Sequence, residues 1–530
     1  MIKEAAYEIL VGQLPLMMAL ALDGLPYEII STILVNLQTD QATLAAICRV
    51  SQYFGSVATP FLYRVIQQHE DTPHDPRRVP LLLRSLLRNP ALGIHVVEVQ
   101  LRVPGQKCED VGCFCEEEWV LVRGLVARLY ETGLFTEELF SKNILHTTEL
   151  RNSVSSEETW NKNVREGQWD AMFSLMLYCC PSLEKLRGLH WNRWDGLGPS
   201  YPGFYFFGFF MSAVALSKTL GRLHAKKSGL VPILPHYRDA HVSNKTGESG
   251  QPILLQSLLP FLYSPSVELV RVDPKIQGGP TQNHRLWGDR QLSMKKLVIK
   301  QSMMSADTLG YLLDSCEVLE EFVLEYGIED KKYSMFGSMR MMVYDKGPLP
   351  GRLLRSKKTL TKLELARGFY TLYFRNYSHV DQTLGSLKDF EVLTHLTVKL
   401  ELLVWDGKPS AESSLCGIMP RSLEYLSITT EDVLSSADMR LFVDTVSRKE
   451  RSLLRNVEHF EELVLRKERV VPNLRHLGLD GIQQETADNS ALTPLKRACA
   501  TYDVQLSIVL YRAYYRAPGE PEMDSERVSF

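Results

Sequence analysis

Three closely spaced cysteines are the residues of this sequence with the clearest capacity for chemistry. Cys108, Cys113 and Cys115 fall in the stretch CEDVGCFC, and thiolates at such short spacing can bind zinc. His95 and His146 are the candidates for a fourth ligand. However, the spacing is not the paired Cys-x-x-Cys of zinc sites, and no second pair follows. We therefore expect reduced loop thiols here, and no metal.

Other residues with catalytic potential do not form a known active-site pattern. His69, Glu70 and His74 resemble the His-Glu-x-x-His zinc-protease motif, but the second histidine comes one residue late. Pro73 would also break the helix that the motif requires. The sequence contains no phosphate-binding loop, dinucleotide-binding glycine motif or Gly-x-Ser-x-Gly elbow, so it predicts no catalytic residues and no cofactor. An enzyme with an unrecognised site stays open, and a pocket where acidic residues converge on His69 or His95 would support it.

The length and composition favour a large globular chain. Its 530 residues, 45% of them hydrophobic and 23% charged, suffice for two or more domains or for one repeat array. A net charge of -3 gives no electrostatic footprint for nucleic acid. Nine cysteines form no dense even framework, so we expect a reducing compartment, the cytoplasm or the nucleus. The apolar stretch 203–217 is shorter than the about 20 residues of a membrane-spanning helix, so we expect a core segment and no membrane partner.

Three short helices are predicted near the start of the chain, over 25–37, 41–50 and 51–66. In the first, Pro26 suits the first helical position, and an apolar stripe recurs at three- and four-residue steps. Asp40 can cap the second helix, and Pro60 predicts a break within the third. Because three such helices make only a marginal core, the unit should gain stability by docking on a partner or on the rest of its chain.

The order of residues through these helices resembles the F-box motif. Leu-Pro-x-Glu-Ile opens the match, Arg-Val-Ser-x-x-Phe follows, and Pro-Phe-Leu-Tyr-Arg-x-Ile closes it at residue 66. The resemblance implies a module that docks on the Skp-type adaptor of a cullin–RING ubiquitin ligase. The adaptor contacts that it implies are Leu25, Pro26, Ile29, Ile33, Leu37, Leu44, Val50, Ser51, Phe54, Leu62 and Tyr63. The turn QTDQA departs mildly from the more acidic or proline-containing turn of many members.

A short apolar phrase, L-x-x-L-x-L in its ideal form, recurs through the rest of the chain. It occurs at 96–101, 267–272, 294–299, 319–324, 360–365, 393–398, 423–428 and 474–479, with a weaker copy at 183–189. The phrase is typical of strands in leucine-rich repeats, where strand–helix units stack because none can bury its apolar face alone. The spacing is irregular, roughly 25 to 50 residues rather than 20–29, and the signature Asn or Cys is missing. We therefore predict an α/β fold, an irregular leucine-rich-repeat solenoid with parallel strands; a plain α/β domain whose buried strands begin with leucine is the alternative.

The predicted organisation has five parts. They are a leader segment at 1–22, the F-box at 23–67, a linker at 68–80, the irregular leucine-rich-repeat-like α/β domain at 81–515 and a flexible tail at 516–530. Within the large domain, 226–252, 275–291 and 328–352 are expected to be loop insertions. As a whole, the chain resembles the F-box/leucine-rich-repeat proteins common in filamentous fungi.

The function that the resemblance implies is that of a non-enzymatic substrate receptor. The front helices would dock on the adaptor, and through it on a cullin, while the repeat domain holds an unknown protein target near the ubiquitin-charged enzyme. Lys295, Lys296 and Lys300 are expected to lie on a solvated face rather than to bind an acidic or phosphorylated target. The alternative is a repeat-domain scaffold whose front helices are only a structural cap. A docking module leaves Leu25 and Pro26 exposed, whereas a cap buries them against the first repeat.

Overall fold

A computed structural model describes most of the chain in two compact units. The described residues are 25–38, 40–67, 78–100, 114–131, 156–190, 234–243, 253–262, 264, 266–273, 276–278, 292–304, 306–326, 349–367, 384–403, 415–429, 457–483, 492–511 and 525–529. The first unit comprises Met1–Phe140, Thr147–His190 and Trp194–Arg238, and the second Ser141–His146, Trp191–Arg193 and Asp239–Phe530. The predicted leader at 1–22 and the apolar stretch 203–217 lie outside the described residues. Among the described residues, no helix is long and apolar enough to cross a membrane.

The first unit begins with three short helices, which we call the front helices. They are α3 (Tyr27–Asn36), α4 (Gln41–Cys48) and α5 (Gln52–Arg64). The predicted cap of α4 is confirmed, because the Asp40 side chain accepts a hydrogen bond from Thr43 N at 3.0 Å. The predicted break at Pro60 is wrong: α5 is continuous through it. A proline removes only one backbone donor, and the neighbouring turn stays closed, where Thr59 Oγ1 donates to Gly55 O at 2.6 Å.

The rest of the first unit packs helices against a small parallel sheet. After the front helices come β1 (Val65–Gln67), α6 (Arg78–Arg88), η1 (Pro90–His95), β2 (Glu98–Gln100), α7 (Glu116–Glu131), α10 (Glu157–Arg165), α11 (Trp169–Tyr178) and β3 (Lys185–His190). Strand β2 pairs in parallel with β1 and with β3, which aligns Val99 with Ile66 and Leu186. A glycine is required at Gly93, because a Cβ there would collide with the carbonyl oxygen of Cys179.

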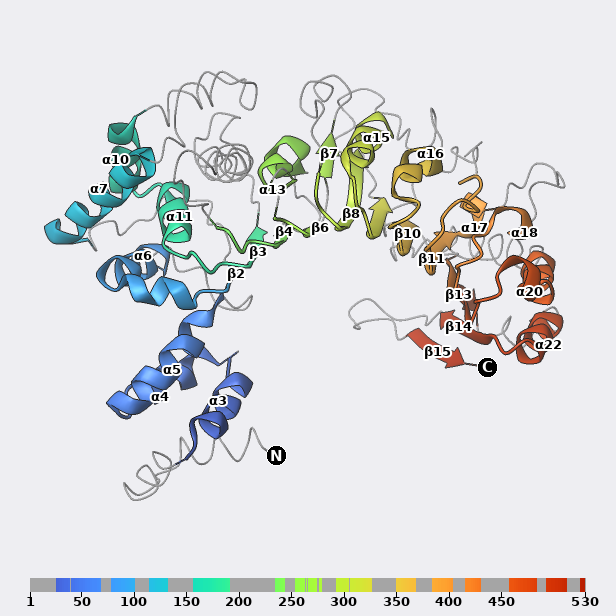
Figure 1. Cartoon of the computed structure of the whole chain (residues 1–530), viewed down its shortest axis with the longest axis horizontal. Helices are drawn as coiled ribbons and strands as arrows, with labels where there is room; N and C mark the ends of the chain where they lie inside the picture. The colour runs from blue at the N-terminus through green and yellow to red at the C-terminus, as the bar shows by residue number, and fades with distance from the viewer. Residues whose placement is uncertain are drawn as a thin grey trace, which may run out of the picture. The chain divides into compact units, whose positions relative to one another are not determined.

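The second unit is a longer, open parallel sheet. Figure 1 shows its strands following one another from green to red. Its strands are β4 (Asp239–Ser243), β5 (Ile253–Leu254), β6 (Leu269–Asp273), β7 (Ile276–Gly278), β8 (Lys296–Met304), β9 (Glu321–Tyr326), β10 (Lys362–Arg367), β11 (His395–Lys399), β12 (Tyr425–Thr429), β13 (His476–Gln483), β14 (Gln505–Tyr511) and β15 (Ser525–Ser529). The order is β4-β6-β8-β9-β10-β11-β12-β13-β14-β15, all parallel except the last pair, and β7 pairs with β5 and β8.

Short helices connect these strands. They are η3 (Leu255–Leu258), α13 (Leu259–Leu262), α15 (Ala306–Ser315), α16 (Leu349–Leu353), η5 (Leu354–Ser356), α17 (Leu400–Leu403), α18 (Leu415–Ile418), α20 (Lys467–Val470) and α22 (Thr493–Thr501). The alternation of strands and helices confirms the predicted α/β class with parallel strands. In such a sheet each strand buries one face under the helices, so a strand and the helix after it depend on their neighbours for a core.

The repeated apolar phrase sets the register of this sheet. Leu363 of β10 aligns with Leu396 of β11, then with Leu426 of β12 and Leu477 of β13. All four side chains are fully buried. Each copy of the phrase therefore contributes the same position to one continuous apolar layer, which is why strands separated by irregular insertions still stack in step.

Several segments predicted to be irregular contain regular structure. The expected loops at 226–252, 275–291 and 328–352 include β4, β7 and the start of α16, and α6 begins inside the expected linker at 68–80. Strand β4 follows the apolar spacing without a leucine, since Tyr237 just before it and Ala240 and Val242 within it are buried. The tail at 516–530 was expected to be flexible, but β15 pairs antiparallel with β14 and covers backbone groups that would otherwise form a sheet edge.

Candidate functional site

An exposed apolar row on α3 is the strongest candidate for a functional surface. Ile29 and Ile33 keep 49% and 39% of their surface exposed, and Pro26, just before the helix, is also exposed. Because successive residues are turned by about 100° around a helix, Ile29 and Ile33 lie on one side of α3, while Ile30 and Leu34 are turned into the core. One helix thus carries an inward apolar stripe and an adjoining outward one. Exposed apolar side chains gathered in this way are typical of interaction surfaces.

The packing of the front helices holds this row in place. Their core contains Ile30, Leu34, Leu44, Ile47, Phe54, Val57 and Ala58, with Leu25, Leu37, Cys48, Phe61 and Leu62 packed around it. Ser51 caps α5, since its hydroxyl accepts a hydrogen bond from Phe54 N at 3.2 Å. Helices α4 and α5 approach closely at Gly55, where an added Cβ would lie 3.0 Å from Cys48 O. The three helices therefore form one small, capped core that fixes the side of α3 that faces outward.

The residues implied by the F-box resemblance divide into three groups by burial. Pro26, Ile29, Ile33 and Val50 are exposed; Leu25, Leu37, Ser51, Leu62 and Tyr63 are half-buried; Leu44 and Phe54 are buried. Leu44 and Phe54 lie inside the core of the front helices, so they support the surface rather than form it. The expectation of a fully exposed Leu25 is wrong, because its side chain packs against that same core.

The described contacts that join the front helices to the sheet of the first unit lie around the carboxyl end of α5. Arg64 O, at the end of α5, accepts a hydrogen bond from Val97 N at 3.0 Å, and β1 continues directly into pairing with β2. Gln41 Nε2 donates to Val65 O at 2.6 Å, which ties the start of α4 to the same junction. The junction thus uses α4, α5 and β1, and it leaves Ile29 and Ile33 of α3 exposed.

Sequence reasoning did not single out three further exposed apolar residues on these helices. Tyr27 and Val35 of α3 and Tyr53 of α5 are all exposed. Tyr27 and Val35 fall outside the three- and four-residue stripe from which the core was predicted, and a projection of α3 around its axis would have shown them as a second outward group. Val35 lies about 200° around the helix from Ile33, so it occupies the opposite side of α3.

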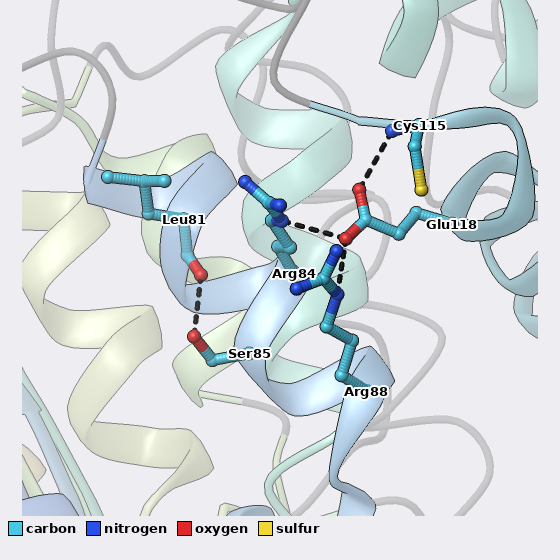
Figure 2. Close-up of polar contacts among 6 residues, drawn as sticks. All are labelled: Leu81, Arg84, Ser85, Arg88, Cys115 and Glu118. Carbon is cyan, nitrogen blue, oxygen red and sulfur yellow. Dashed lines mark hydrogen bonds and ion pairs between the residues drawn. The ribbon is translucent and has the colours of Figure 1, made fainter.

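A buried carboxylate with two arginine partners lies beside Cys115, the one residue of the cysteine cluster that the structure describes. Figure 2 shows Glu118 of α7 between two arginines of α6. Its Oε1 atom lies 2.7 Å from Arg84 Nε and 2.6 Å from Arg88 Nε, and its Oε2 atom accepts a hydrogen bond from Cys115 N at 2.8 Å. Cys115 precedes the first residue of α7 and Glu118 is the third, the arrangement of a capping box. Cys115 therefore marks the start of a helix, and its thiol is exposed.

The electrostatics of this cluster are those of a structural contact. Burial acts to raise the pKa of Glu118, but the hydrogen bonds from Cys115 and Arg84 and the positive charges of Arg84 and Arg88 outweigh it and hold the pKa below its ordinary value. The carboxylate is thus charged at neutral pH and fully occupied by its partners. This is the opposite of what a general acid requires.

The described residues contain no metal-binding cluster. No group of three or more His, Cys, Asp or Glu side chains converges among them, while Cys108, Cys113 and His146 lie outside the described residues. Cys180 is buried, and burial raises its pKa well above the ordinary value. Burial likewise raises the pKa of Cys179 to about 12. Both thiols are therefore protonated at neutral pH, which makes them core residues rather than nucleophiles.

Comparison with known proteins gives this chain no family. A comparison with protein-family models found no match, and a comparison with curated proteins found no similar chain. The exposed row of α3, the core beneath it and the parallel sheet are therefore the features from which a function can be inferred. A fold of this kind occurs in proteins with many functions, so a function has to be inferred from the surface residues.

Proposed function

We propose that this chain is a substrate-recognition subunit of an SCF-type cullin–RING ubiquitin ligase. The front helices act as an F-box and dock on the Skp-type adaptor, and the adaptor links the chain to a cullin. The observation that carries the proposal is the exposure of Ile29 and Ile33 on one side of a helix whose Ile30 and Leu34 are buried in the core. Two such side chains in water cost free energy that a partner recovers by covering them.

The remainder of the chain is proposed to be an irregular leucine-rich-repeat solenoid that holds the protein target. The support comes from the register, since each copy of the apolar phrase occupies the same position in the parallel sheet. Such a sheet buries one side of each strand and presents the alternate side chains on its other face. The side chains on that second face vary from strand to strand, and the proposal assigns target specificity to them.

The proposed contribution to ubiquitin transfer is proximity. A receptor that binds its target and its ligase together raises the effective concentration of target lysines near the charged enzyme. No catalytic residue of its own is needed for that role. The ligase so formed would act in the cytoplasm or the nucleus.

The alternative is a scaffold whose front helices serve only as a structural cap. A cap stabilises its domain by burying its apolar residues against it. The exposure of Pro26, Ile29 and Ile33 disfavours this alternative, because these residues contribute nothing to a cap while they remain in water. We therefore prefer the docking proposal.

The proposal can be tested by co-purification of the full chain with a purified Skp-type adaptor. The variant Ile29→Asp/Ile33→Asp should lose the adaptor. An interface that covers the exposed parts of both isoleucines gains at least about 1.3 kcal/mol, about tenfold in affinity, and the two aspartates would add unpaired charges there. Since both side chains are exposed, the variant should keep the circular dichroism and melting temperature of the native chain.

Val35→Asp is the matched control. Val35 is 51% exposed, it lies on the same helix, and a new aspartate there adds a negative charge near the same helix end. It lies on the side of α3 opposite Ile33, so this variant should retain the adaptor. Retention of the adaptor by the double variant, or failure of the native chain to bind it, would favour the scaffold.

A further inference from the structure

One side of α7 faces water although apolar residues lie on it. Val120 and Leu121 keep 56% and 43% of their surface exposed. Another side of the helix is buried in the first unit, through Glu118, Val122, Leu125, Val126 and Leu129. The helix also packs on α10, where the ring centroids of Tyr130 and Trp160 are 6.2 Å apart. The packing of the first unit therefore uses one side of α7 and leaves the other open.

Four residues form a row along the open side. Glu117, Leu121, Gly124 and Arg128 follow one another at steps of four, three and four residues, and all four are exposed. Because each residue is turned by about 100° around a helix, these steps keep the row within about 60° of the helix surface. We call these four residues the α7 row. Val120 lies beside the row and widens its apolar middle.

Gly124 is the member of the row that the chain's own packing does not require. A glycine inside a helix lowers the stability of that helix relative to alanine. A Cβ would fit here, because apart from the neighbouring residues and the backbone of the helix itself, no described atom would lie within 4 Å of it. At Gly93, by contrast, the chain leaves no room for a Cβ. A glycine on an open helix surface allows a second molecule to approach closely.

Opposite charges lie at the two ends of the row. Glu117 and Arg128 are about 16 Å apart along the helix, too far to pair with each other. Among the described residues, neither has an ion-pair partner. Arg128 Nε donates to Gly124 O at 3.3 Å, a bond that an exposed arginine can exchange for a stronger one to a carboxylate. Arg128 also lies near Tyr178 and Cys179, whose raised pKa values keep both side chains uncharged at neutral pH.

The order of the four residues makes the row complementary to itself. In a two-fold symmetric pair of antiparallel helices, each contact between two different residues occurs twice. If Leu121 lies over Gly124 of a second copy, the same register sets Glu117 opposite Arg128 of that copy. A leucine side chain then fills the space that the missing Cβ leaves, and an ion pair closes each end. A parallel pair would instead set Glu117 against Glu117 and Arg128 against Arg128.

We propose that the α7 row is a docking surface for a second copy of this chain, joined as an antiparallel pair of α7 helices. A foreign helix with a single sign of charge would match one end of the row and repel the other, so the row favours its own copy. An interface of one helix pair falls in the small class, below about 1,200 Å², so the dimer forms weakly and with a marked dependence on concentration. The inference does not depend on the ligase proposal, which concerns α3.

The test is sedimentation equilibrium of the full chain over a wide range of concentrations. The native chain should dimerise reversibly. Leu121→Asp should weaken the dimer at least about tenfold, because both copies lose an apolar contact and gain a charge in its place. Gly124→Ala should also weaken it, while the melting temperature stays the same or rises, since alanine suits a helix better than glycine. A weaker dimer of an equally stable chain separates docking from folding.

Charge reversal tests the antiparallel register. Glu117→Arg alone should weaken the dimer about tenfold, because two-fold symmetry turns two attractive pairs into two repulsive ones. Glu117→Arg/Arg128→Glu should restore the dimer, since the two charges exchange places. Glu158→Arg is the matched control: Glu158 is also an exposed glutamate in the first turn of its helix, α10, and its reversal should leave the dimer unchanged.

The same measurements are repeated on Ile29→Asp/Ile33→Asp, because the exposed row of α3 is a second apolar surface. The dimer should persist in that variant, and its loss there would overturn the proposal. A chain that stays monomeric at every concentration would also overturn it and leave the α7 row to a different partner. So would a dimer that Leu121→Asp or Gly124→Ala leaves unchanged, or a double reversal that stays as weak as the single one.

Discussion

Burial decides what each residue of the front helices does. Ile33 and Leu44 are both apolar, and the F-box resemblance assigns both to the adaptor. The structure separates them: Ile33 is 39% exposed, while Leu44 is fully buried within the core of the three helices. A substitution at Ile33 therefore acts on a surface, and one at Leu44 acts on stability.

Leu44→Ala should destabilise the front helices without changing their outer surface. Removal of a buried leucine side chain typically lowers the free energy of unfolding by about 2–5 kcal/mol, since apolar contacts are lost and a cavity remains. Faster amide hydrogen exchange in α4 and α5 is the expected sign. The exposed Val50→Ala is the control and should leave exchange unchanged; equal effects of the two variants would contradict the assigned core.

The sequence predicted the apolar stripe of α3, but not which of its residues are buried and which are exposed. The three- and four-residue spacing identifies Ile29, Ile30, Ile33 and Leu34 alike as apolar. Which two of them face inward depends on where α4 and α5 pack, and that is a tertiary property. The same limit explains Leu25, which was expected to be fully exposed and is half-buried against this core.

At the scale of elements, the contact between α6 and α7 depends on one buried carboxylate. Glu118 belongs to the capping box of α7 and also to ion pairs with Arg84 and Arg88 of α6 (Figure 2). The same side chain thus starts one helix and attaches it to another. A buried charge of this kind is stable only while all of its partners are present.

Glu118→Gln should lower the free energy of unfolding by about 1–3 kcal/mol at neutral pH, because an amide cannot satisfy both arginines and the helix cap. The pKa of Glu118 is lowered in the folded state, so its stabilising effect is present above the unfolded pKa and is lost as the pH falls through the folded pKa. Denaturant unfolding at a series of pH values should therefore show a weaker acid dependence in the variant. A variant with the native pH dependence would rule out this role for Glu118.

Strand β4, which sequence reasoning missed, lacks the leucine of the phrase. Tyr237 just before the strand and Ala240 and Val242 within it are buried at the spacing of the phrase. Strand β15 could not be expected from its own sequence, because it gains its order by pairing with β14. The expected break at Pro60 failed for a related reason: the packing of α5 outweighs the loss of one hydrogen bond.

At the scale of the whole molecule, the sequence predicted the parallel α/β class and most strands of the second unit. This worked because every copy of the phrase must bury its apolar residues in one shared layer, whatever the length of the segment before it. The stacking of His395, Tyr425 and His476 was not predicted, because these residues become neighbours only through the register of three separate strands. Residues that are about 30 and 50 positions apart carry no local signal of such a contact.

The central claim is that the outward side of α3 is a docking surface for a Skp-type adaptor. The most direct test is amide hydrogen exchange of the full chain, measured by mass spectrometry with and without a saturating amount of purified adaptor. The account predicts slower exchange over Pro26 to Leu37 in the complex, because a covered helix opens less often, and unchanged exchange in β10 to β13. Unchanged exchange throughout α3 in the presence of the adaptor, or protection confined to the strands of the second unit, would contradict it.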